Sequence, residues 1–213
     1  MEKFSGLINR LKKELEKGLP GKEYQNRMTS MHRNKFMGTT DRPPKKCGVL
    51  LLLYPFENQI FIPFIKRTLS DYPHSGQISF PGGKYENSDE SVIYTAIRET
   101  HEEIGVVPQD ILLAGSLTSI FIPVSNFIVF PSVGYVLSRP VFDANAAEVQ
   151  EIIEVSLNIF IDPKYLSTFK LRMSNKEIAV PCYRVGNNTI WGATAMIMSE
   201  FVESVNRTGM FSD

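Results

Sequence analysis

The stretch from Gly82 to Val106 constrains this chain most strongly, because it joins a glycine pair, a polar loop and a glutamate-rich helix in the sequence GGKYENSDESVIYTAIRETHEEIGV. Glu99, Glu102 and Glu103 are spaced at i, i+3 and i+4, so a helix presents them on one face. Three carboxylates on one face repel each other unless a cation lies between them. We therefore interpret the rest of the chain as the scaffold of this cluster.

Local signals predict both ends of the helix in this stretch. Asn87 is followed three residues later by Glu90, which resembles a capping box and places the helix start between residues 87 and 91. Gly105 suits the position just beyond a helix end. Arg98 is expected to pair with Glu90, and the glutamates are expected to lie to one side of the buried stripe. That stripe is predicted to contain Ile93, Ala96, Ile97, Thr100 and Ile104.

Hydrophobic patterns divide the whole chain into an arm and a main domain. Residues 3–17 carry an apolar stripe that predicts a surface helix, and residues 22–46 are polar and predict an irregular arm. We expect residues 1–42 to form this helix and arm, and residues 43–213 to form an α/β domain whose mixed sheet is covered on both faces. A helix is predicted over 190–205, and strands over 47–54, 59–66, 77–80, 112–120, 127–137, 152–157, 168–173 and 177–185.

Composition argues against several classes of partner. The chain has 23 basic and 23 acidic residues, so its net charge predicts no bulk attraction to nucleic acid or membrane. The longest apolar run, Val49 to Phe56, suits a buried strand and is far shorter than the roughly 20 residues that span a bilayer. The N-terminus has no apolar core of the signal-peptide type, and the two cysteines are far apart in sequence. We expect a soluble, cytoplasmic protein.

The glutamate face has the chemistry of a metal site. Hard divalent cations such as Mg²⁺ take oxygen ligands, usually a few carboxylates together with water and substrate phosphates. Glu99, Glu102 and Glu103 offer such oxygens, and a glycine at position 83 lets a backbone carbonyl approach closely. From the three glutamates alone, a solvated acidic helix face is the alternative interpretation.

The wider pattern resembles the Nudix box, the motif of hydrolases that cleave a diphosphate linked to another moiety. The box has the form G-x5-E-x7-R-E-U-x-E-E-x-G-U, with U a bulky apolar residue, and the chain follows it from Gly83 to Val106. Six residues separate Gly83 from Glu90, one more than in the general box, and Thr100 replaces the first apolar residue. The longer spacing resembles the coenzyme A pyrophosphatase branch of the family.

A second pattern, upstream of the box, also resembles that branch, whose motif is roughly L-L-T-x-R-[SA]-x3-R-x3-G-x3-F-P-G-G. Arg67, Gly76 and the segment 80–83 match it, whereas Thr68 stands at the Ser/Ala position and Tyr72 at the second arginine. Further matches occur in the expected order at Leu19 to Gly21, Gln25, Met28, Val124 to Phe127, Pro131, Ala147 to Val149, and Ile190 to Ala195.

The resemblance implies a Nudix α/β/α sandwich with a mixed β-sheet. It also implies hydrolysis of coenzyme A, or its derivatives, to 4′-phosphopantetheine (or its acyl form) and adenosine 3′,5′-bisphosphate. The expected partner is a small nucleotide of the coenzyme A type. No nucleic-acid or membrane partner is expected, and a homodimer is compatible with the resemblance. Two alternatives stay open, namely a Nudix enzyme for another nucleoside diphosphate such as ADP-ribose, and a catalytically silent domain that binds a nucleotide.

The resemblance also implies roles for individual residues. Mg²⁺ or Mn²⁺ would be held by Glu99, Glu102, Glu103 and the Gly83 carbonyl, and would lower the pKa of a bound water. Glu102 or Glu103 would complete the deprotonation of that water. The alternative bases lie in the acidic segment 142–151, where Glu148 is preferred to Glu151.

Three further residues are predicted to bind the substrate. Arg67 and Lys84 flank the expected cleft and suit a polyanion. His74, in the loop before the glycine pair, would contact a phosphate or anchor its own loop by a hydrogen bond.

Overall fold

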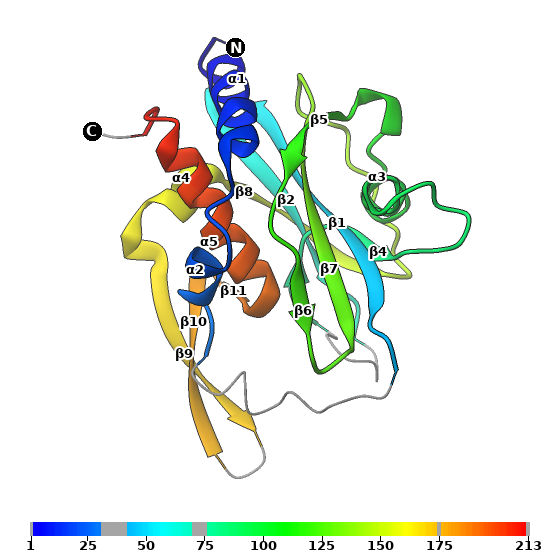
Figure 1. Ribbon diagram of the computed structural model, residues 1–213, viewed down its shortest axis with the longest axis vertical. Coiled ribbons are helices and arrows are strands. Elements are labelled where there is room, and N and C mark those ends of the chain that lie inside the picture. The colour runs from blue at the N-terminus through cyan, green and yellow to red at the C-terminus, as the bar shows by residue number, and fades with distance from the viewer. Residues whose placement is uncertain (1, 31–41, 70–75, 174–175, 212–213) are drawn as a thin grey trace.

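Figure 1 shows a computed structural model of the chain, which describes residues 2–30, 42–69, 76–173 and 176–211. Its helices are α1 (Glu2–Lys17), α2 (Lys22–Asn26), α3 (Val92–Ile104), α4 (Leu157–Ile161) and α5 (Gly192–Arg207), with short 3-10 turns at Pro108–Asp110 and Pro163–Tyr165. The early strands are β1 (Lys45–Phe56), β2 (Gln59–Arg67), β3 (Ile78–Ser79), β4 (Gly82–Lys84), β5 (Leu112–Ser116) and β6 (Ile120–Ile122). The later strands are β7 (Phe127–Tyr135), β8 (Val149–Ser156), β9 (Leu166–Met173), β10 (Lys176–Val185) and β11 (Asn188–Trp191).

The main sheet is mixed. Its central path runs β3-β2-β1-β7-β5, with β4 paired to β1, β6 to β7 and β8 to β2. β1 and β7 are parallel, and the other pairs in this sheet are antiparallel. A smaller antiparallel sheet has the order β11-β10-β9.

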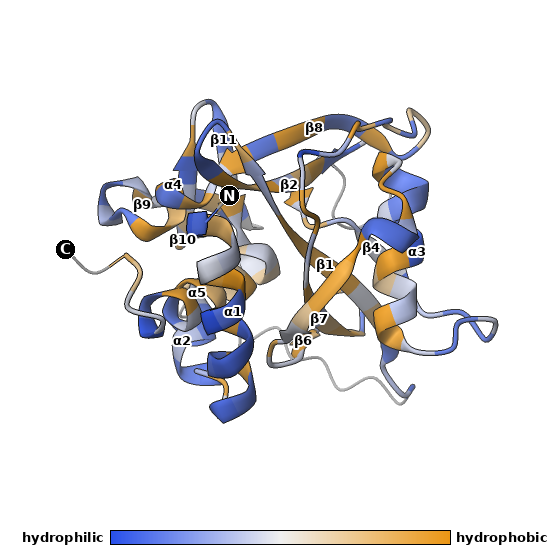
Figure 2. Cartoon of the chain, turned by 90° about the horizontal axis from the view of Figure 1, so that it is seen from above, coloured by the Kyte–Doolittle hydropathy of each residue, from blue (hydrophilic) through white to orange (hydrophobic). Residues whose placement is uncertain are grey.

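Helices cover both faces of the main sheet, as Figure 2 shows, with α3 on one side and α1 and α5 on the other. All five apolar residues of the predicted N-terminal stripe are buried in the layer with α5, namely Phe4, Leu7, Ile8, Leu11 and Leu15. The predicted α/β/α sandwich with a mixed sheet is therefore confirmed. The boundary expected at residue 42 stays a prediction.

β1 explains why one segment of the chain is almost continuously apolar. Leu51 and Leu53 pack into the layer with α1 and α5, whereas Leu50 and Leu52 pack beneath α3. A strand covered on both faces needs apolar side chains at odd and even positions alike. The hairpin to β2 turns at Glu57 and Asn58, whose φ angles of 47° and 58° suit a type I′ turn.

Helix α3 begins later than the predicted capping box implied. Ser91 is the N-cap, and its hydroxyl accepts a hydrogen bond from the Tyr94 N–H at 3.1 Å, so a nearer side chain already caps the first turn. The capping box at Asn87 and Glu90 is therefore wrong. Gly105 ends the helix in the left-handed conformation with φ 74°, as predicted.

The buried face of α3 is also wider than predicted. Ala96, Thr100 and Ile104 are buried, and Ile93 and Ile97 are half-buried. Thr95 and Glu103 join this face, so one of the three glutamates does not lie to the side.

Two predicted elements are divided by tertiary contacts. The strand expected over 112–120 separates into β5 and β6, because Glu200 accepts a hydrogen bond from the Thr118 N–H at 3.1 Å and draws it away from the sheet. The helix expected from residue 190 begins at Gly192, since Ile190 pairs with Tyr183 in the smaller sheet.

A buried carboxylate fastens the N-terminal arm to the core. Glu200 of α5 accepts hydrogen bonds from the Gly21 N–H at 3.2 Å, the Gln25 amide at 2.7 Å and the Thr118 hydroxyl at 2.7 Å. The side chain of Glu200 is fully buried. Two arm residues noted in the sequence, Gly21 and Gln25, therefore satisfy a buried charge.

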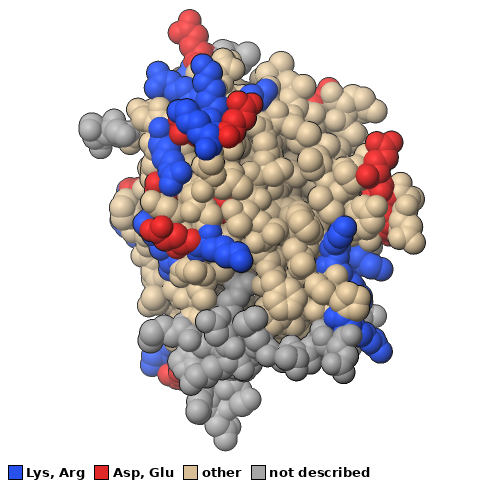
Figure 3. Space-filling model, in the orientation of Figure 1, with Lys and Arg blue, Asp and Glu red and all other residues tan. Residues whose placement is uncertain are grey.

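The surface carries mixed charges. On the face drawn in Figure 3, described Lys and Arg side chains lie beside Asp and Glu side chains at the upper left, a second group of Lys and Arg lies at the lower right, and uncharged surface separates the two groups. This distribution agrees with the zero formal net charge of the chain. Among the described residues, no helix is long and apolar enough to span a membrane.

Candidate active site

The most deeply buried of the three glutamates is Glu103, at 1% exposure. Its Oε2 accepts a hydrogen bond from the Gly82 N–H at 2.8 Å, and its Oε1 lies 3.4 Å from Nη1 of Arg67. Burial raises the pKa of Glu103 to about 8, although the Gly82 N–H and the Arg67 guanidinium both act to lower it. The residue thus binds the glycine pair to α3.

Glu99 lies one turn earlier and packs directly against Gly83. A Cβ atom at position 83 would lie 2.3 Å from the Glu99 carboxyl carbon, so any side chain there would displace the carboxylate. Burial also raises the pKa of Glu99, while Arg98, 3.1 Å from its Oε1, acts to lower it. The absent side chain therefore leaves room for the Glu99 carboxylate, whereas the carbonyl ligand expected at Gly83 stays a prediction.

Arg98 pairs with Asp89, so the predicted pair with Glu90 is wrong. Its Nε lies 2.9 Å from Asp89 Oδ1 and its Nη2 3.1 Å from Oδ2. Asp89 is buried, whereas Glu90 is exposed. The Asp89 carboxylate also accepts hydrogen bonds from the Thr95 hydroxyl at 2.8 Å and the Glu86 N–H at 3.0 Å, which hold it beneath the start of α3.

This pairing makes Asp89, rather than Glu90, the residue that fills the acidic position of the box. Residues 84 to 88 separate Gly83 from Asp89, which is the five-residue spacing of the general box. The additional residue therefore falls between Asp89 and Arg98. Hydrogen bonds from the Arg98 guanidinium hold the pKa of Asp89 well below its usual range.

Glu102 occupies the outer part of the same helix face. Its side chain is 51% exposed, and its Oε2 lies 2.8 Å from Nη1 of Arg98. Among the described residues, no three His, Cys, Asp or Glu side chains converge closely enough to hold a metal ion as they stand. Arg98 holds Glu102 outward, whereas the Gly82 N–H and Arg67 hold Glu103 inward.

The chemistry of these groups nevertheless fits a hard divalent cation. The donors are carboxylate oxygens, which are the ligands that Mg²⁺ and Mn²⁺ prefer. The pKa values of Glu99 and Glu103 are raised by burial; the Glu102 charge raises that of Glu99 further, and the Glu99 charge raises that of Glu103 further. A bound cation would therefore stabilise their charged forms. The assignment of Glu99, Glu102, Glu103 and Gly83 as metal ligands stays a prediction.

The three predicted substrate-binding residues differ in where the structure places them. Arg67 ends β2 and reaches Glu103, with 36% of its side chain exposed. Lys84 ends β4 and is exposed, and its backbone carbonyl accepts a hydrogen bond from Arg98 at 3.4 Å. His74 and Tyr72 lie outside the described residues.

Glu148 lies within electrostatic range of Glu99 and Glu103. Its exposed carboxylate contributes to the raised pKa values of Glu99 and Glu103. Glu151, the alternative base, is exposed on β8 opposite Lys66. In sequence, 44 residues lie between Glu103 and Glu148, so local sequence patterns alone do not show this proximity.

Sequence reasoning missed two residues of β1 that shape the site. A Cβ atom at Gly48 would lie 2.1 Å from the Val92 carbonyl, so this glycine lets α3 rest on the sheet. Cys47 is half-buried in the electrostatic field of Glu99 and Arg67. Burial raises the pKa of this thiol to about 12, so it is neutral at physiological pH.

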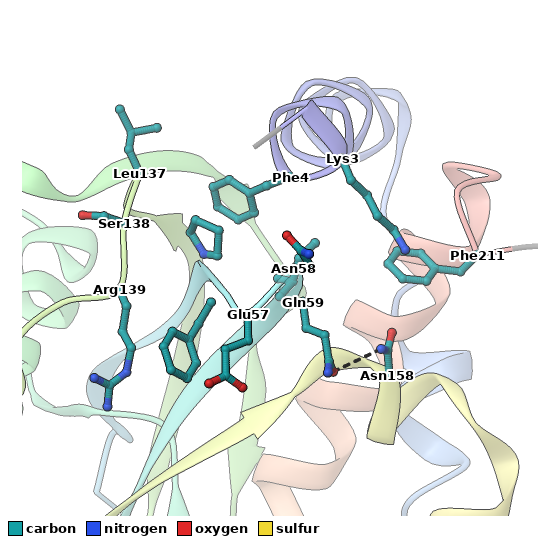
Figure 4. A pocket seen from close by; sticks show the side chains of 13 residues that line it. Lys3, Phe4, Glu57, Asn58, Gln59, Leu137, Ser138, Arg139, Asn158 and Phe211 are labelled. Atoms are coloured by element: carbon teal, nitrogen blue, oxygen red, sulfur yellow. Dashed lines mark hydrogen bonds between the residues drawn. The ribbon is translucent and has the colours of Figure 1, made fainter.

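A separate pocket of about 590 Å³ lies at the other end of β1 and is shown in Figure 4. Phe4 of α1, Phe56 of the hairpin and Arg139 after β7 are among its lining residues. Phe56 is eight residues from Gly48 along β1, which is about 26 Å at the rise of a strand. The pocket is lined by none of the predicted site residues.

The fold and the site together define an α/β/α domain in which a glycine pair packs against a carboxylate-rich helix. A model of the NUDIX domain matches residues 44–178, and the chain therefore belongs to the Nudix family. The Nudix hydrolase NudL of Photorhabdus laumondii is 27% identical over 178 residues, which cover 81% of this chain and 95% of that protein.

Two further relatives are longer than this chain. The nudix hydrolase C6G9.05 of Schizosaccharomyces pombe is 26% identical over 179 residues, covering 82% of this chain and 62% of its own length. Nudix hydrolase 22, chloroplastic, of Arabidopsis thaliana is 30% identical over 162 residues, covering 73% of this chain and 53% of its own length. This chain thus spans little more than half of each.

Solved structures share the fold. A MutT/nudix family protein from Enterococcus faecalis has a TM-score of 0.52 at 18% identity, covering 86% of this chain and 73% of that one. A bifunctional NMN adenylyltransferase/ADP ribose pyrophosphatase from Francisella tularensis has a TM-score of 0.50 at 18% identity, covering 82% and 45%. At these identities the similarity concerns the fold alone.

Proposed function

We propose that this Nudix domain hydrolyses the diphosphate bond of coenzyme A or its derivatives, giving 4′-phosphopantetheine, or its acyl form, and adenosine 3′,5′-bisphosphate. The observation that carries hydrolysis is the Glu103 carboxylate, buried against the Gly82 N–H and Arg67 and close to Glu99. The preference for coenzyme A rests on the upstream pattern that leads from Arg67 to the glycine pair.

Glu99, Glu102, Glu103 and the Gly83 carbonyl are the groups that would hold Mg²⁺ or Mn²⁺. Such an ion neutralises charge on a diphosphate and lowers the pKa of a bound water. The Gly82 N–H orients the Glu103 carboxylate at 2.8 Å.

The rest of the box supports these carboxylates. Asp89 holds the guanidinium of Arg98, which in turn holds the Glu102 carboxylate at 2.8 Å. Because Asp89 is buried and accepts two hydrogen bonds from Arg98, it limits the positions that Arg98 can take. This chain of contacts would preorganise the exposed part of the metal site.

Several carboxylates are candidates for taking a proton from the attacking water. Glu148 is exposed, lies close to Glu99 and Glu103, and is our preferred base outside the box. Glu102 and Glu103 are the candidates within it. A base works best when its pKa lies near the working pH. Without a cation, the pKa of the buried Glu103, about 8, meets this condition.

Arg67, Lys84 and His74 are proposed to bind the substrate phosphates. Among the described residues, the Arg67 guanidinium pairs only with Glu103, so its other N–H groups are available to a diphosphate. The exposed Lys84 at the end of β4 would add a second positive charge. Both side chains would reduce repulsion between the substrate and the glutamates.

A second candidate is hydrolysis of another nucleoside diphosphate, such as ADP-ribose. Tyr72 favours it, because this residue stands where the coenzyme A pattern has an arginine. The third candidate is a catalytically silent domain, which would bind a nucleotide but show no metal-dependent hydrolysis of it.

Product analysis distinguishes these three functions. The purified protein is incubated with Mg²⁺ or Mn²⁺ and with coenzyme A, ADP-ribose or NADH, and the products are separated by chromatography. Cleavage of coenzyme A to adenosine 3′,5′-bisphosphate is the expected result, whereas cleavage of ADP-ribose alone overturns the substrate but leaves the Nudix activity. Near-wild-type turnover by Glu102→Gln at saturating Mg²⁺ would show that the site assignment is wrong.

A further inference from the structure

Two lysines near the glycine pair lie on hydrogen-bonded strands. Lys45 is the first residue of β1, and Lys84 is the last residue of β4. The two strands are antiparallel, with Gly48 opposite Gly83 and Cys47 opposite Lys84. Lys45 lies three residues before Gly48 along β1, which is about 10 Å at the rise of a strand. Both lysine side chains are exposed.

The alternation of side chains along a strand places both lysines on the same face of the sheet. A Cβ atom at Gly83 would meet the Glu99 carboxylate of α3, so the side chain of the next residue, Lys84, points away from α3. Cys47 packs in the layer with α1 and α5, and Lys45, two residues away, shares its face. The two lysines are therefore diagonal neighbours on adjacent strands, a separation that long side chains bridge.

Lys46, between Lys45 and Cys47, has the opposite orientation. Gly48 faces α3, because a Cβ atom there would lie 2.1 Å from the Val92 carbonyl, and Lys46 shares that face. Nζ of Lys46 lies 5.8 Å from the centre of the Tyr85 ring, on the side of the sheet that α3 covers. Adjacent lysines of β1 thus lie on opposite faces, although both are exposed.

The face that carries Lys45 and Lys84 has two positive charges close together. Among the residues that the structure describes, neither lysine forms a salt bridge with an Asp or Glu side chain. Nζ of Lys45 lies 5.9 Å from the centre of the Phe127 ring, which is opposite it on β7 and limits where the ammonium group can lie. In Figure 3, Lys and Arg side chains gather over the start of β1. Like charges this close repel each other unless an anion lies between them.

A phosphate monoester on the proposed substrate matches this arrangement. In coenzyme A, the ribose that carries the diphosphate at its 5′ position also carries a phosphate at its 3′ position, so one sugar separates the two groups. ADP-ribose and NADH have no phosphate monoester. A lysine ammonium is a compact charge with three donors, which suits phosphate oxygens.

We propose that Lys45 and Lys84 form a subsite for the 3′-phosphate of coenzyme A, and that Lys45 determines the preference for this nucleotide over ADP-ribose. Lys84 adjoins Gly83 and is within reach of either phosphate group, whereas Lys45 is farther along the sheet and binds the 3′-phosphate alone. The inference rests on the proposed function in placing the diphosphate at the glycine pair.

A pair of nucleotides that differ only in the 3′-phosphate tests this subsite. Dissociation constants of adenosine 3′,5′-bisphosphate and adenosine 5′-monophosphate are measured by calorimetry for the wild type, Lys45→Ala, Lys45→Arg and Lys46→Ala. We expect the wild type to bind the bisphosphate at least about tenfold more tightly than the monophosphate. Lys45→Ala should weaken bisphosphate binding about tenfold and change monophosphate binding less than about twofold. Lys45→Arg keeps the charge and should keep most of the preference.

Lys46→Ala is the matched control, because it removes an exposed lysine from the next position of β1 but from the opposite face of the sheet. It should leave the preference for the bisphosphate unchanged. An equal loss in Lys45→Ala and Lys46→Ala would overturn the subsite, since it would reflect the general positive charge of the region. Equal affinity of the wild type for the two nucleotides, or no detectable binding of the bisphosphate, would overturn it as well.

Kinetics with coenzyme A and 3′-dephospho-coenzyme A separate this inference from the proposed function. A preference for coenzyme A in kcat/KM that Lys45→Ala removes, mainly through KM, supports both. A protein that cleaves no diphosphate but binds the bisphosphate in a Lys45-dependent way retains the subsite and loses the proposed function. Cleavage of coenzyme A with the same preference in the wild type and Lys45→Ala retains the function and loses the subsite.

Discussion

The buried pair of Asp89 and Arg98 offers the sharpest test of the site architecture. Asp89→Asn removes the negative charge that accepts two hydrogen bonds from Arg98, at 2.9 and 3.1 Å, while keeping the size of the side chain. The Asp89 side chain is 1% exposed and that of Arg98 is 20% exposed, so water replaces the lost partner poorly. The adjacent Glu90→Gln is the matched control, because Glu90 is exposed.

The expected loss can be worked out from these contacts. A hydrogen bond to a charged group contributes about 1.5–3 kcal/mol, and breaking a buried ion pair costs about 3–5 kcal/mol. The asparagine retains part of the hydrogen bonding, so we expect Asp89→Asn to lower the free energy of unfolding by about 3 kcal/mol. In a protein of this size, that loss lowers Tm by about 6–12 °C. Glu90→Gln should change the free energy by less than about 0.5 kcal/mol.

The pH dependence of this loss has a definite sign. The guanidinium of Arg98 lowers the pKa of Asp89 in the folded state, so this carboxylate stabilises the fold above its unfolded pKa of about 3.9. That stability is lost as the pH falls through the lower folded pKa. The difference in Tm between wild type and Asp89→Asn should therefore be constant from pH 6 to pH 8 and shrink below about pH 4.

Thermal and urea unfolding of the three proteins provide the measurement. A loss for Glu90→Gln as large as that for Asp89→Asn would refute the pairing, and so would a loss below about 1 kcal/mol for Asp89→Asn. We also expect turnover to fall in Asp89→Asn, since Arg98 no longer holds Glu102.

Three other predictions follow from single contacts. Gly83→Ala places a Cβ 2.3 Å from the Glu99 carboxylate and should lower metal-dependent turnover, measured by steady-state kinetics, at least about a hundredfold. The control Gly6→Ala, whose Cβ meets Met210 at an ordinary 3.5 Å, should leave turnover unchanged. Burial raises the pKa of Glu103 in the folded state to about 8, so without divalent cations the wild type should lose stability relative to Glu103→Gln as the pH rises from 5 to 9. A difference in Tm between the two proteins that stays constant over this range would contradict this. Glu200→Gln alters a fully buried acceptor of several hydrogen bonds and should cost about 2–3 kcal/mol in urea unfolding; an equal cost for Glu203→Gln, whose side chain is 21% exposed and pairs with Arg207, would argue against the role of Glu200 in fastening the arm.

Much of the architecture could be predicted from periodicity, because burial on one or two faces leaves a local pattern. The apolar run of β1 predicted a buried strand, which the structure covers on both sides, and the stripe of α1 predicted five residues that are all buried. Gly105 predicted the end of α3, since a left-handed cap needs only its own φ. The i, i+3, i+4 spacing likewise placed three glutamates together on one helix face.

The start of α3 and the partner of Arg98 could not be predicted in this way. Asp89 and Glu90 are adjacent carboxylates, and both lie within reach of Arg98 in sequence. Only the turn that bonds Asp89 to the Glu86 N–H and the Thr95 hydroxyl buries one carboxylate and leaves the other exposed.

The sequence by itself determined which groups of the box are available: carboxylates at helical spacing, an arginine between them and a glycine pair before them. Tertiary structure alone decided their roles. Packing of α3 on the sheet buries Glu103 and leaves Glu102 exposed. Hydrogen bonds from the N–H groups of Asp143 and Asn145 bind the last turn of α3. The physical reason is that helical spacing is a local property, whereas burial and charge depend on which distant segments cover each face.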